Sequence, residues 1–123
     1  MAINYGHDTV YYWPKGGYLG TFWVGPFYLV LLPGTYNVTA YFMITEPCNG
    51  TVGVLQATNM VGSQIYASTP ILCSYFKEPN KWVGITLTLV VSNSSVDPIM
   101  LRCINMTGAT GVYFSGVAIT QIS

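Results

Sequence analysis

Strict alternation of apolar and polar residues over two long segments is the feature that most constrains the fold. Between residues 35 and 45, every second position is apolar: Tyr36, Val38, Ala40, Phe42 and Ile44. Residues 81–92 repeat the pattern with a second apolar set: Val83, Ile85, Leu87, Leu89 and Val91. A period of two places successive side chains on opposite faces of a strand. Both segments are therefore predicted to be half-buried β-strands.

The rest of the chain favours shorter strands separated by turns. These are predicted at residues 18–24, 27–32, 51–56, 64–67, 71–76, 98–104 and 112–122. Clusters of Pro, Gly and Asn separate them, and Gly116 is a candidate β-bulge inside the last one. No stretch has apolar residues at helical spacing over three turns. The pattern predicts an all-β protein, an antiparallel β-sandwich with a single core.

Composition limits the partners of such a domain. Charged residues make up 7% of the 123 residues, against about 25% in an average soluble protein, and the formal net charge is zero. Little like-charge repulsion keeps copies apart, so association with other copies is favoured. The four cations are scattered along the chain: Lys15, Lys77, Lys81 and Arg102. A nucleic-acid surface needs clustered cations, so no nucleic-acid partner is expected.

The apolar stretches are too short to span a membrane as a helix. The longest, residues 22–32, is interrupted by Gly25 and Pro26 and falls short of the ~20 residues that a spanning helix needs. Residues 1–8 show no basic region and no long apolar run, so no signal peptide is visible. Either a signal was removed or the protein leaves the cell by another route, such as inside a virion. The expected location is extracellular, in a cell-surface appendage or on a virion surface.

Cysteine and asparagine both bear on the compartment. Three cysteines allow at most one intrachain disulfide from three possible pairings, and three buried free thiols are the alternative. Cys48 lies in a turn-like segment, and we choose Cys73 as its partner. Four Asn-x-Ser/Thr sequons are present where chance predicts about one, and they predict glycans at Asn37, Asn49, Asn93 and Asn105. Glycans would hydrate a surface that has few charges.

One segment resembles a known family of jelly-roll domains. The run Leu32-Pro33-Gly34-Thr35-Tyr36-Asn37-Val38-Thr39-Ala40 is similar to the P-G-x-Y-x-V-x-A strand of small domains of the tumour-necrosis-factor and complement globular-head type. Residues 85–91, 99–103 and 108–117 resemble the final strands of that family, so the likeness covers about half the chain. Residues 95–98 stand where the family has a Gly-Asp turn. Because of this departure, the resemblance implies a jelly-roll-like sandwich but not the family's receptor-binding role. A virion capsid or receptor-binding jelly roll that forms closed oligomers is a separate alternative.

The composition also resembles that of extracellular filament subunits from hyperthermophilic archaea and their viruses, which are rich in Thr, Tyr and sequons. That resemblance implies a homopolymer, a pilus or virion fibre, built by donating an N-terminal strand to the next subunit. Residues 1–13 are the candidate donor strand and residues 14–123 the sandwich, with a hinge at residues 14–17. The donor face would carry Ile3, Tyr5, Thr9, Tyr11 and Trp13. In the alternative, residues 8–13 form the first strand of the chain's own sheet.

Signs of catalysis are weak. His7 is the only histidine, and its neighbour Asp8 would point to the opposite face of a strand. The remaining acids, Glu46, Glu78 and Asp97, have no spacing typical of a catalytic pair. No ligand spacing predicts a metal site. We therefore expect no catalytic residues, no metal and no cofactor, and a protein that is not an enzyme.

Aromatic residues allow one further function. Eight of them gather in the first quarter of the chain: Tyr11, Tyr12, Trp13, Tyr18, Phe22, Trp23, Phe27 and Tyr28. They could form a platform for sugar rings, or belong to the core and a subunit interface. The sequence thus leads to three functions in order of preference. These are a filament subunit assembled from copies of itself, a closed capsid or receptor-binding oligomer, and a carbohydrate-binding module. Cell-surface glycans or receptors are the other partners expected.

Overall fold

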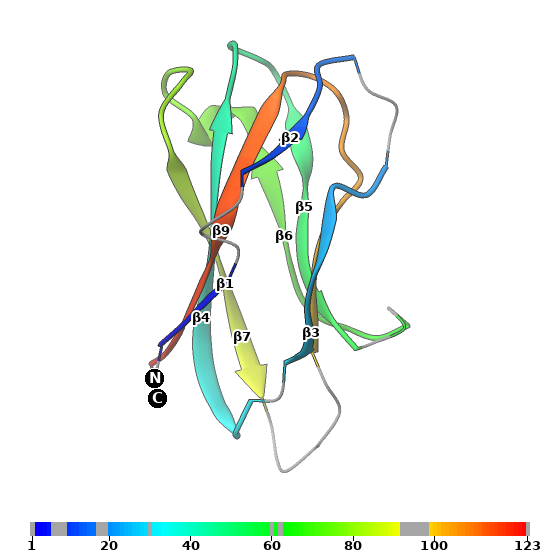
Figure 1. Ribbon diagram of the computed structural model, residues 1–123, viewed down its shortest axis with the longest axis vertical. Helices are drawn as coiled ribbons and strands as arrows, with labels where there is room; N and C mark the ends of the chain where they lie inside the picture. The colour runs from blue at the N-terminus through cyan, green and yellow to red at the C-terminus, as the bar shows by residue number, and fades with distance from the viewer. Residues whose placement is uncertain are drawn as a thin grey trace.

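The computed structural model is a sandwich of two antiparallel β-sheets (Figure 1). The structure describes residues 2–5, 10–16, 20–29, 31–59, 61, 63–91 and 99–122, with the backbone alone for 2–5 and 23–29. The first sheet has the order β1-β9-β4-β7, with β2 also on β9, and comprises β1 (Ala2–Tyr5), β2 (Tyr11–Trp13), β4 (Gly34–Ile44), β7 (Val83–Val91) and β9 (Val112–Gln121). The second has the order β3-β8-β5-β6 and comprises β3 (Trp23–Leu29), β5 (Thr51–Thr58), β6 (Ile65–Leu72) and β8 (Ile99–Ile104). The predicted all-β, jelly-roll-like sandwich is confirmed.

The core lies between the two sheets, where the sequence pattern predicted it. All five predicted inward residues of β4 have at most 1% of their surface exposed. On β7, Ile85, Leu87 and Leu89 are buried, whereas Val83 and Val91 at the strand ends are half-buried. From the second sheet, Leu101 and Cys103 of β8 complete the core. Burial of these alternating faces is the main stabilising contribution to such a sandwich.

A β-bulge lies at the predicted position in β9. Tyr41 of β4 pairs with Gly116, but the next residue, Phe42, pairs with Phe114, so Ser115 is the additional residue. Gly116 has φ +138°, a conformation that glycine adopts readily. The bulge allows β9 to keep both Phe114 and Val117 buried despite the shift of register.

Two breaks between strands were predicted wrongly, both at prolines, and the strand predicted at 71–76 is wrong from residue 73 on, where η1 follows β6. β3 continues through Gly25 and Pro26, where the sequence predicted a turn between two strands, and its register against β8 is irregular after Gly25. β6 likewise continues through Pro70, where two strands had been expected. Both strands are at edges of the second sheet, where one side of the backbone needs no partner. A missing N–H on that side is tolerated.

The N-terminal segment pairs with the chain's own β9. Residues 2–5 pair with 117–120, and residues 11–13 pair with 112–114. Tyr5 and Tyr11 are six positions apart, yet their partners Val117 and Phe114 are three apart. β1 and β2 therefore do not form one continuous ladder with β9. The predicted division of the chain at residue 13 stays a prediction. Both parts belong to the sheet formed by the remainder of the chain, as the alternative proposed for residues 8–13.

Two of the candidate donor residues face the chain's own core. The ring of Tyr11 lies 6.0 Å from that of Phe114, and the ring of Trp13 lies 5.9 Å from that of Phe22. The side chains of Ile3 and Tyr5, and all of Thr9, lie outside the described part of the chain. Exchange of this segment between copies stays a prediction.

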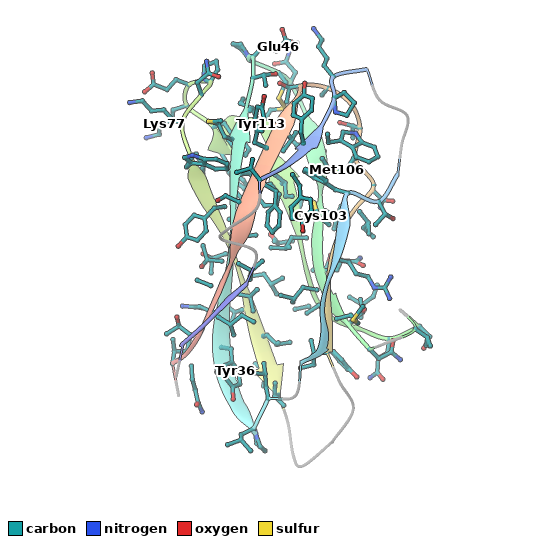
Figure 2. The ribbon with its side chains drawn as sticks, viewed as in Figure 1. Tyr36, Glu46, Lys77, Cys103, Met106 and Tyr113 are labelled. Carbon is teal, nitrogen blue, oxygen red and sulfur yellow. A yellow bond between two sulfur atoms is a disulfide. The ribbon has the colours of Figure 1, made fainter. Side chains whose placement is uncertain are left out.

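A disulfide joins Cys48 and Cys73, the pair chosen in the sequence analysis, with a Cα–Cα distance of 5.5 Å. It links the β4–β5 connection to the 3-10 helix η1 (Cys73–Tyr75), so it ties the two sheets together at one end. Cys103 is a free thiol in the core, 3.7 Å from the sulfur of Met106 (Figure 2). Burial raises the pKa of the Cys103 thiol far above its usual range, so the thiol is neutral in the folded protein.

In the part of the chain that the structure describes, no helix has the length and apolar character to cross a membrane.

Candidate functional site

The outer face of the first sheet has a polar half. The hydroxyls of Thr39 on β4 and Thr86 on β7 share a hydrogen bond of 2.8 Å. One pair further along, Thr88 Oγ1 donates to Asn37 Oδ1 at 3.3 Å. These residues are the outward members of the alternating pattern. Cross-strand hydroxyl and amide pairs of this kind stabilise the sheet and also leave the surface rich in hydrogen-bonding groups.

The other half of this face carries large side chains, three of them tyrosines, on three neighbouring strands. We define the aromatic row as Tyr12 on β2, Tyr113 on β9, and Tyr41 and Met43 on β4. Tyr12 is paired with Tyr113, and Tyr113 with Met43. The rings of Tyr12 and Tyr113 lie 4.7 Å apart at an angle of 37°. Tyr12 is 49% exposed and the other three are half-buried, so the row forms a continuous accessible surface.

Glycine on the neighbouring strand determines how Tyr41 lies. Tyr41 is in register with Gly84 on β7 and with Gly116 on β9. A Cβ added to Gly84 would lie 3.3 Å from Tyr41 Cε1 and 2.9 Å from Thr39 Cγ2. The ring of Tyr41 therefore occupies the space above Gly84 that a larger residue would fill. Close contact with the backbone of β7 holds this ring low against the sheet.

The Tyr12 end of the row is held by a network between two loops. Gly111 N donates to Thr45 Oγ1 at 3.1 Å, and Thr45 N donates to Gly111 O at 3.0 Å. Thr110 Oγ1 donates to Glu46 O at 3.0 Å, and Lys15 forms an ion pair with Glu46. A Cβ on Gly111 would lie 2.7 Å from the Tyr12 hydroxyl oxygen. The network thus positions the start of β9, against which Tyr12 packs.

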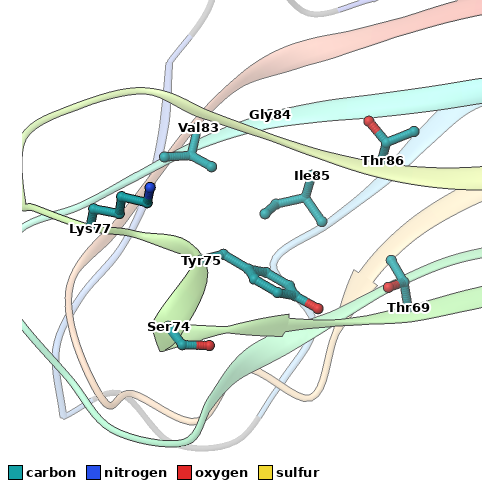
Figure 3. Close-up of a pocket in the computed structure, with 8 residues that line it drawn as sticks. All are labelled: Thr69, Ser74, Tyr75, Lys77, Val83, Gly84, Ile85 and Thr86. Atoms are coloured by element: carbon teal, nitrogen blue, oxygen red, sulfur yellow. The ribbon is translucent and has the colours of Figure 1, made fainter.

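A pocket of about 450 Å³ adjoins the row. It lies where β7, an edge strand of the first sheet, faces β6, an edge strand of the second. Its polar lining residues are Thr69, Ser74, Tyr75, Lys77 and Thr86. Figure 3 shows Tyr75 at its centre, Lys77 at one end and Thr69 and Thr86 at the other. A volume of this size is typical of a small-molecule site.

The pocket has an uncompensated positive charge. Within the described ranges, the cations near it differ: Lys81 forms an ion pair with Glu78 at 2.9 Å, and Lys77 forms none. No Asp or Glu is among the lining residues. Lys77, Glu46 and Tyr113 all lie in the same half of the sandwich, opposite the end that carries Tyr36 (Figure 2).

Only one of the eight aromatics predicted as a platform belongs to the row, namely Tyr12. Tyr11, Trp13 and Phe22 pack on one another or on Phe114 at the rim of the core. The side chains of the rest lie outside the described part: Tyr18, Trp23, Phe27 and Tyr28.

The sequence contains a local indication of the two row residues on β4 that the prediction missed. Tyr41 and Met43 are large side chains on the outward face of a strand whose other outward residues are Thr and Asn. Trp82, which is 44% exposed and directly precedes β7, is likewise a large side chain at an outward position of the alternating pattern.

The sequons differ in their surroundings. Asn49 and Asn105 are exposed in loops, whereas Asn37 is half-buried on the polar half of the first sheet. A hydrogen bond of 2.7 Å from Thr107 Oγ1 to Thr51 O brings the sequons of Asn49 and Asn105 side by side. Asn93 lies outside the described residues. Glycosylation at the four sites stays a prediction.

Of the His, Asp and Glu residues in the chain, only Glu46 and Glu78 lie in the described part. His7, Asp8 and Asp97 lie outside the described residues, and the two acids that are described, Glu46 and Glu78, each pair with a lysine. Among the residues described, no group of three or more His, Cys, Asp and Glu could hold a metal ion.

Among the comparisons with known proteins, only the one with solved structures finds similar proteins. No family model and no curated protein matches the chain. A cyclase from Fischerella sp. TAU, in complex with 4-(1H-indol-3-yl)butan-2-one, aligns with a TM-score of 0.61 and 14% identity over 93% of this chain. The chain spans 65% of that cyclase, slightly less than two thirds of its length.

Two carbohydrate-binding modules are also similar. The C-terminal CBM6 of LamC, a marine laminarinase from Zobellia galactanivorans, aligns with a TM-score of 0.56 and 12% identity, covering 98% of this chain and 100% of the module. A carbohydrate-binding module from Cellvibrio mixtus lichenase 5A, in complex with cellotriose, aligns with a TM-score of 0.50 and 13% identity, covering 97% of this chain and 70% of that one. At these identities the likeness shows the fold alone, a jelly-roll-like β-sandwich.

Proposed function

We propose that the protein is a carbohydrate-binding module whose binding surface is the aromatic row on the first sheet. The observation that carries the proposal is the row itself: Tyr12, Tyr113 and Met43 in register across three strands, with Tyr41 beside Met43 on the same face of β4. The rest of the face is rich in hydroxyls. A sugar ring has an apolar face of C–H groups and a rim of hydroxyls. Aromatic rings complement the first, and Thr and Tyr hydroxyls complement the second.

The dimensions of the row suit a short oligosaccharide. From β2 through β9 to β4 the row crosses two strand spacings, about 10 Å at the usual separation of neighbouring strands. Rings held in register by a sheet are already ordered, so little side-chain entropy is lost on binding. The similarity to two carbohydrate-binding modules supports this function over the filament that the sequence favoured.

We further propose that the protein binds without catalysing a reaction. Of its four carboxylates, Glu46 and Glu78 are each neutralised by a lysine. A glycosidase needs two carboxyl groups that act at one bond, and the two described here are each engaged in an ion pair with a lysine. The disulfide and the four sequons support a site of action outside the cell or on a virion, where glycans are the natural partners.

Affinity electrophoresis through gels that contain a soluble polysaccharide tests the proposal. The panel comprises hydroxyethylcellulose, laminarin, xylan, dextran, polygalacturonate and dextran sulfate. Wild type should be retarded by at least one of them, and Tyr41→Ala and Tyr113→Ala should each weaken that retention by about tenfold, the loss expected for one buried aromatic contact. Val90→Ala is the matched control, because Val90 is 64% exposed at the opposite end of β7. Retention by no polysaccharide, or equal retention of all four proteins, would contradict the proposal.

Filament assembly is the second candidate, favoured by one observation. In the described residues, β1 and β2 pair with β9 and with no other strand, so the N-terminal segment is attached along one side only. Such a segment can be exchanged for that of a neighbouring copy, and exchange in one direction forms a fibre. Electron microscopy of the purified protein tests this: fibres that vanish when residues 1–13 are deleted support it. Monomers, or closed trimers and shells, exclude it, and closed particles would favour the capsid or receptor-binding alternative.

A further inference from the structure

The pocket between β6 and β7 is continuous with the aromatic row through a single residue. Gly84 lies under the ring of Tyr41 and is also part of the pocket wall. Thr86, two positions along β7, also lines the pocket, and its hydroxyl bonds to Thr39 on the outer face. The pocket therefore begins at the β7 side of the row.

The chemistry of the pocket is that of an anion site. Lys77 has no carboxylate partner within the described residues, and the nearest acid in the sequence, Glu78, is held by Lys81. Hydroxyls of Ser74, Tyr75 and Thr69 line the same space and are able to donate further hydrogen bonds. Lys77 is exposed, so water hydrates its ammonium group when the pocket is empty. An anion in the pocket would form a charge-assisted hydrogen bond with this group, which a neutral sugar cannot form.

We propose that the pocket binds the anionic substituent of an acidic glycan, a uronic-acid carboxylate or a sulfate ester, while the sugar rings lie on the aromatic row. The inference rests on the proposed carbohydrate function and names its ligand class. Lysine is a compact charge on a flexible stem, so it accommodates either anion. Because the pocket is open to solvent on one side, the attraction is screened by salt.

Two matched pairs of probes separate charge from sugar identity. Polygalacturonate is compared with its methyl ester, and dextran sulfate with dextran, so each pair differs in charge on the same chain. Wild type should bind the charged member of at least one pair about tenfold more tightly, and the responding pair identifies carboxylate or sulfate. Raising the salt concentration from about 0.1 M to about 1 M, which shortens the screening length from about 10 Å to about 3 Å, should remove this preference.

Variants of Lys77 test the residue that the inference names. Lys77→Ala should abolish the preference for the charged member and leave binding of the neutral member unchanged, whereas Lys77→Arg should retain most of it. Lys81→Ala is the matched control, because Lys81 is a neighbouring lysine whose charge is already paired with Glu78. The Lys81→Ala variant should prefer the charged member of the pair as strongly as wild type does.

The outcomes separate this inference from the function on which it rests. If wild type binds charged and neutral members equally, or if Lys77→Ala keeps the preference, the anion pocket is overturned and carbohydrate binding stands. If Lys81→Ala loses as much as Lys77→Ala, the effect is one of net charge, and the pocket is also overturned. Failure to bind any of the four probes, together with the rest of the panel, overturns both.

Discussion

Removal of the Cys48–Cys73 disulfide should destabilise the sandwich by an amount that its loop length determines. The two cysteines are 25 positions apart in sequence, and a cross-link of that span removes about 12 cal/mol/K of chain entropy from the unfolded state. At 25 °C this is about 3.5 kcal/mol of stability. For a 123-residue domain, the unfolding entropy per residue converts that loss into a melting temperature lower by about 14 °C.

Thermal denaturation followed by circular dichroism measures the shift. The comparison is wild type, wild type with a reductant, and the double variant Cys48→Ser/Cys73→Ser. Reduced wild type and the double variant should melt about 14 °C below the oxidised protein, and the reductant should have no effect on the double variant. Thiol titration of unfolded, unreduced wild type should find one thiol per chain, because Cys103 alone is free. A shift below about 3 °C, or three titratable thiols, would refute the reasoning.

The remaining predictions concern the site, the core and the surface. Gly84→Ala should destabilise the fold by about 1 kcal/mol, because its Cβ would lie 2.9 Å from Thr39 Cγ2, and should weaken glycan retention, because it would lie 3.3 Å from Tyr41 Cε1 and displace that ring. Thr39→Ser, which removes the methyl, should restore the stability in denaturation assays but not the retention in gels, because the contact with Tyr41 remains. Burial raises the pKa of the Cys103 thiol, so at high pH the unfolded chain loses this proton while the folded chain keeps it. The free energy of unfolding should therefore fall above about pH 9, by up to about 1.4 kcal/mol per pH unit, and urea titrations of Cys103→Ala should lack that slope; equal slopes would contradict the assignment. Intact-mass analysis of native material should show glycan mass that Asn49→Gln and Asn105→Gln each reduce, and a mass equal to the bare chain would exclude glycans.

The parts of the fold that sequence predicted are those where local pattern and burial coincide. The inward residues of β4 and β7 follow from alternation, because both strands have one face on the core and the other in solvent. The bulge at Gly116 was also foreseeable, since glycine inside a strand marks such irregularities. Alternation identifies a buried face but contains no information about neighbouring strands.

The errors occurred where position in the sheet overrides local preference. Local preference predicts that Pro26 and Pro70 interrupt a strand. Both lie in edge strands, which tolerate proline, and whether a strand is at an edge depends on the whole sheet. The change of register between Tyr5 and Tyr11 depends on their pairing with β9, at the other end of the chain. Neither feature can be predicted from the residues near it in the sequence.

The candidate site was predictable only in part for the same reason. Tyr41 and Met43 had a visible signal as large side chains on a polar face. The row, however, depends on the register of Tyr113 and Tyr12, and the pocket depends on β6 meeting β7 across the two sheets. The sequence does not distinguish Lys77 from Lys81. In the described structure they differ, because Lys81 forms an ion pair with Glu78 and Lys77 forms none.

A glycan array probed with wild type and with the double variant Tyr41→Ala/Tyr113→Ala tests the central claim most directly. Both tyrosines lie on the outer face of the first sheet, so the variant should melt near the wild-type temperature, and this is checked first. The account predicts that wild type binds a subset of the array enriched in acidic glycans and that the variant loses that binding. An array on which wild type binds nothing, or on which the folded variant binds as wild type does, would contradict it.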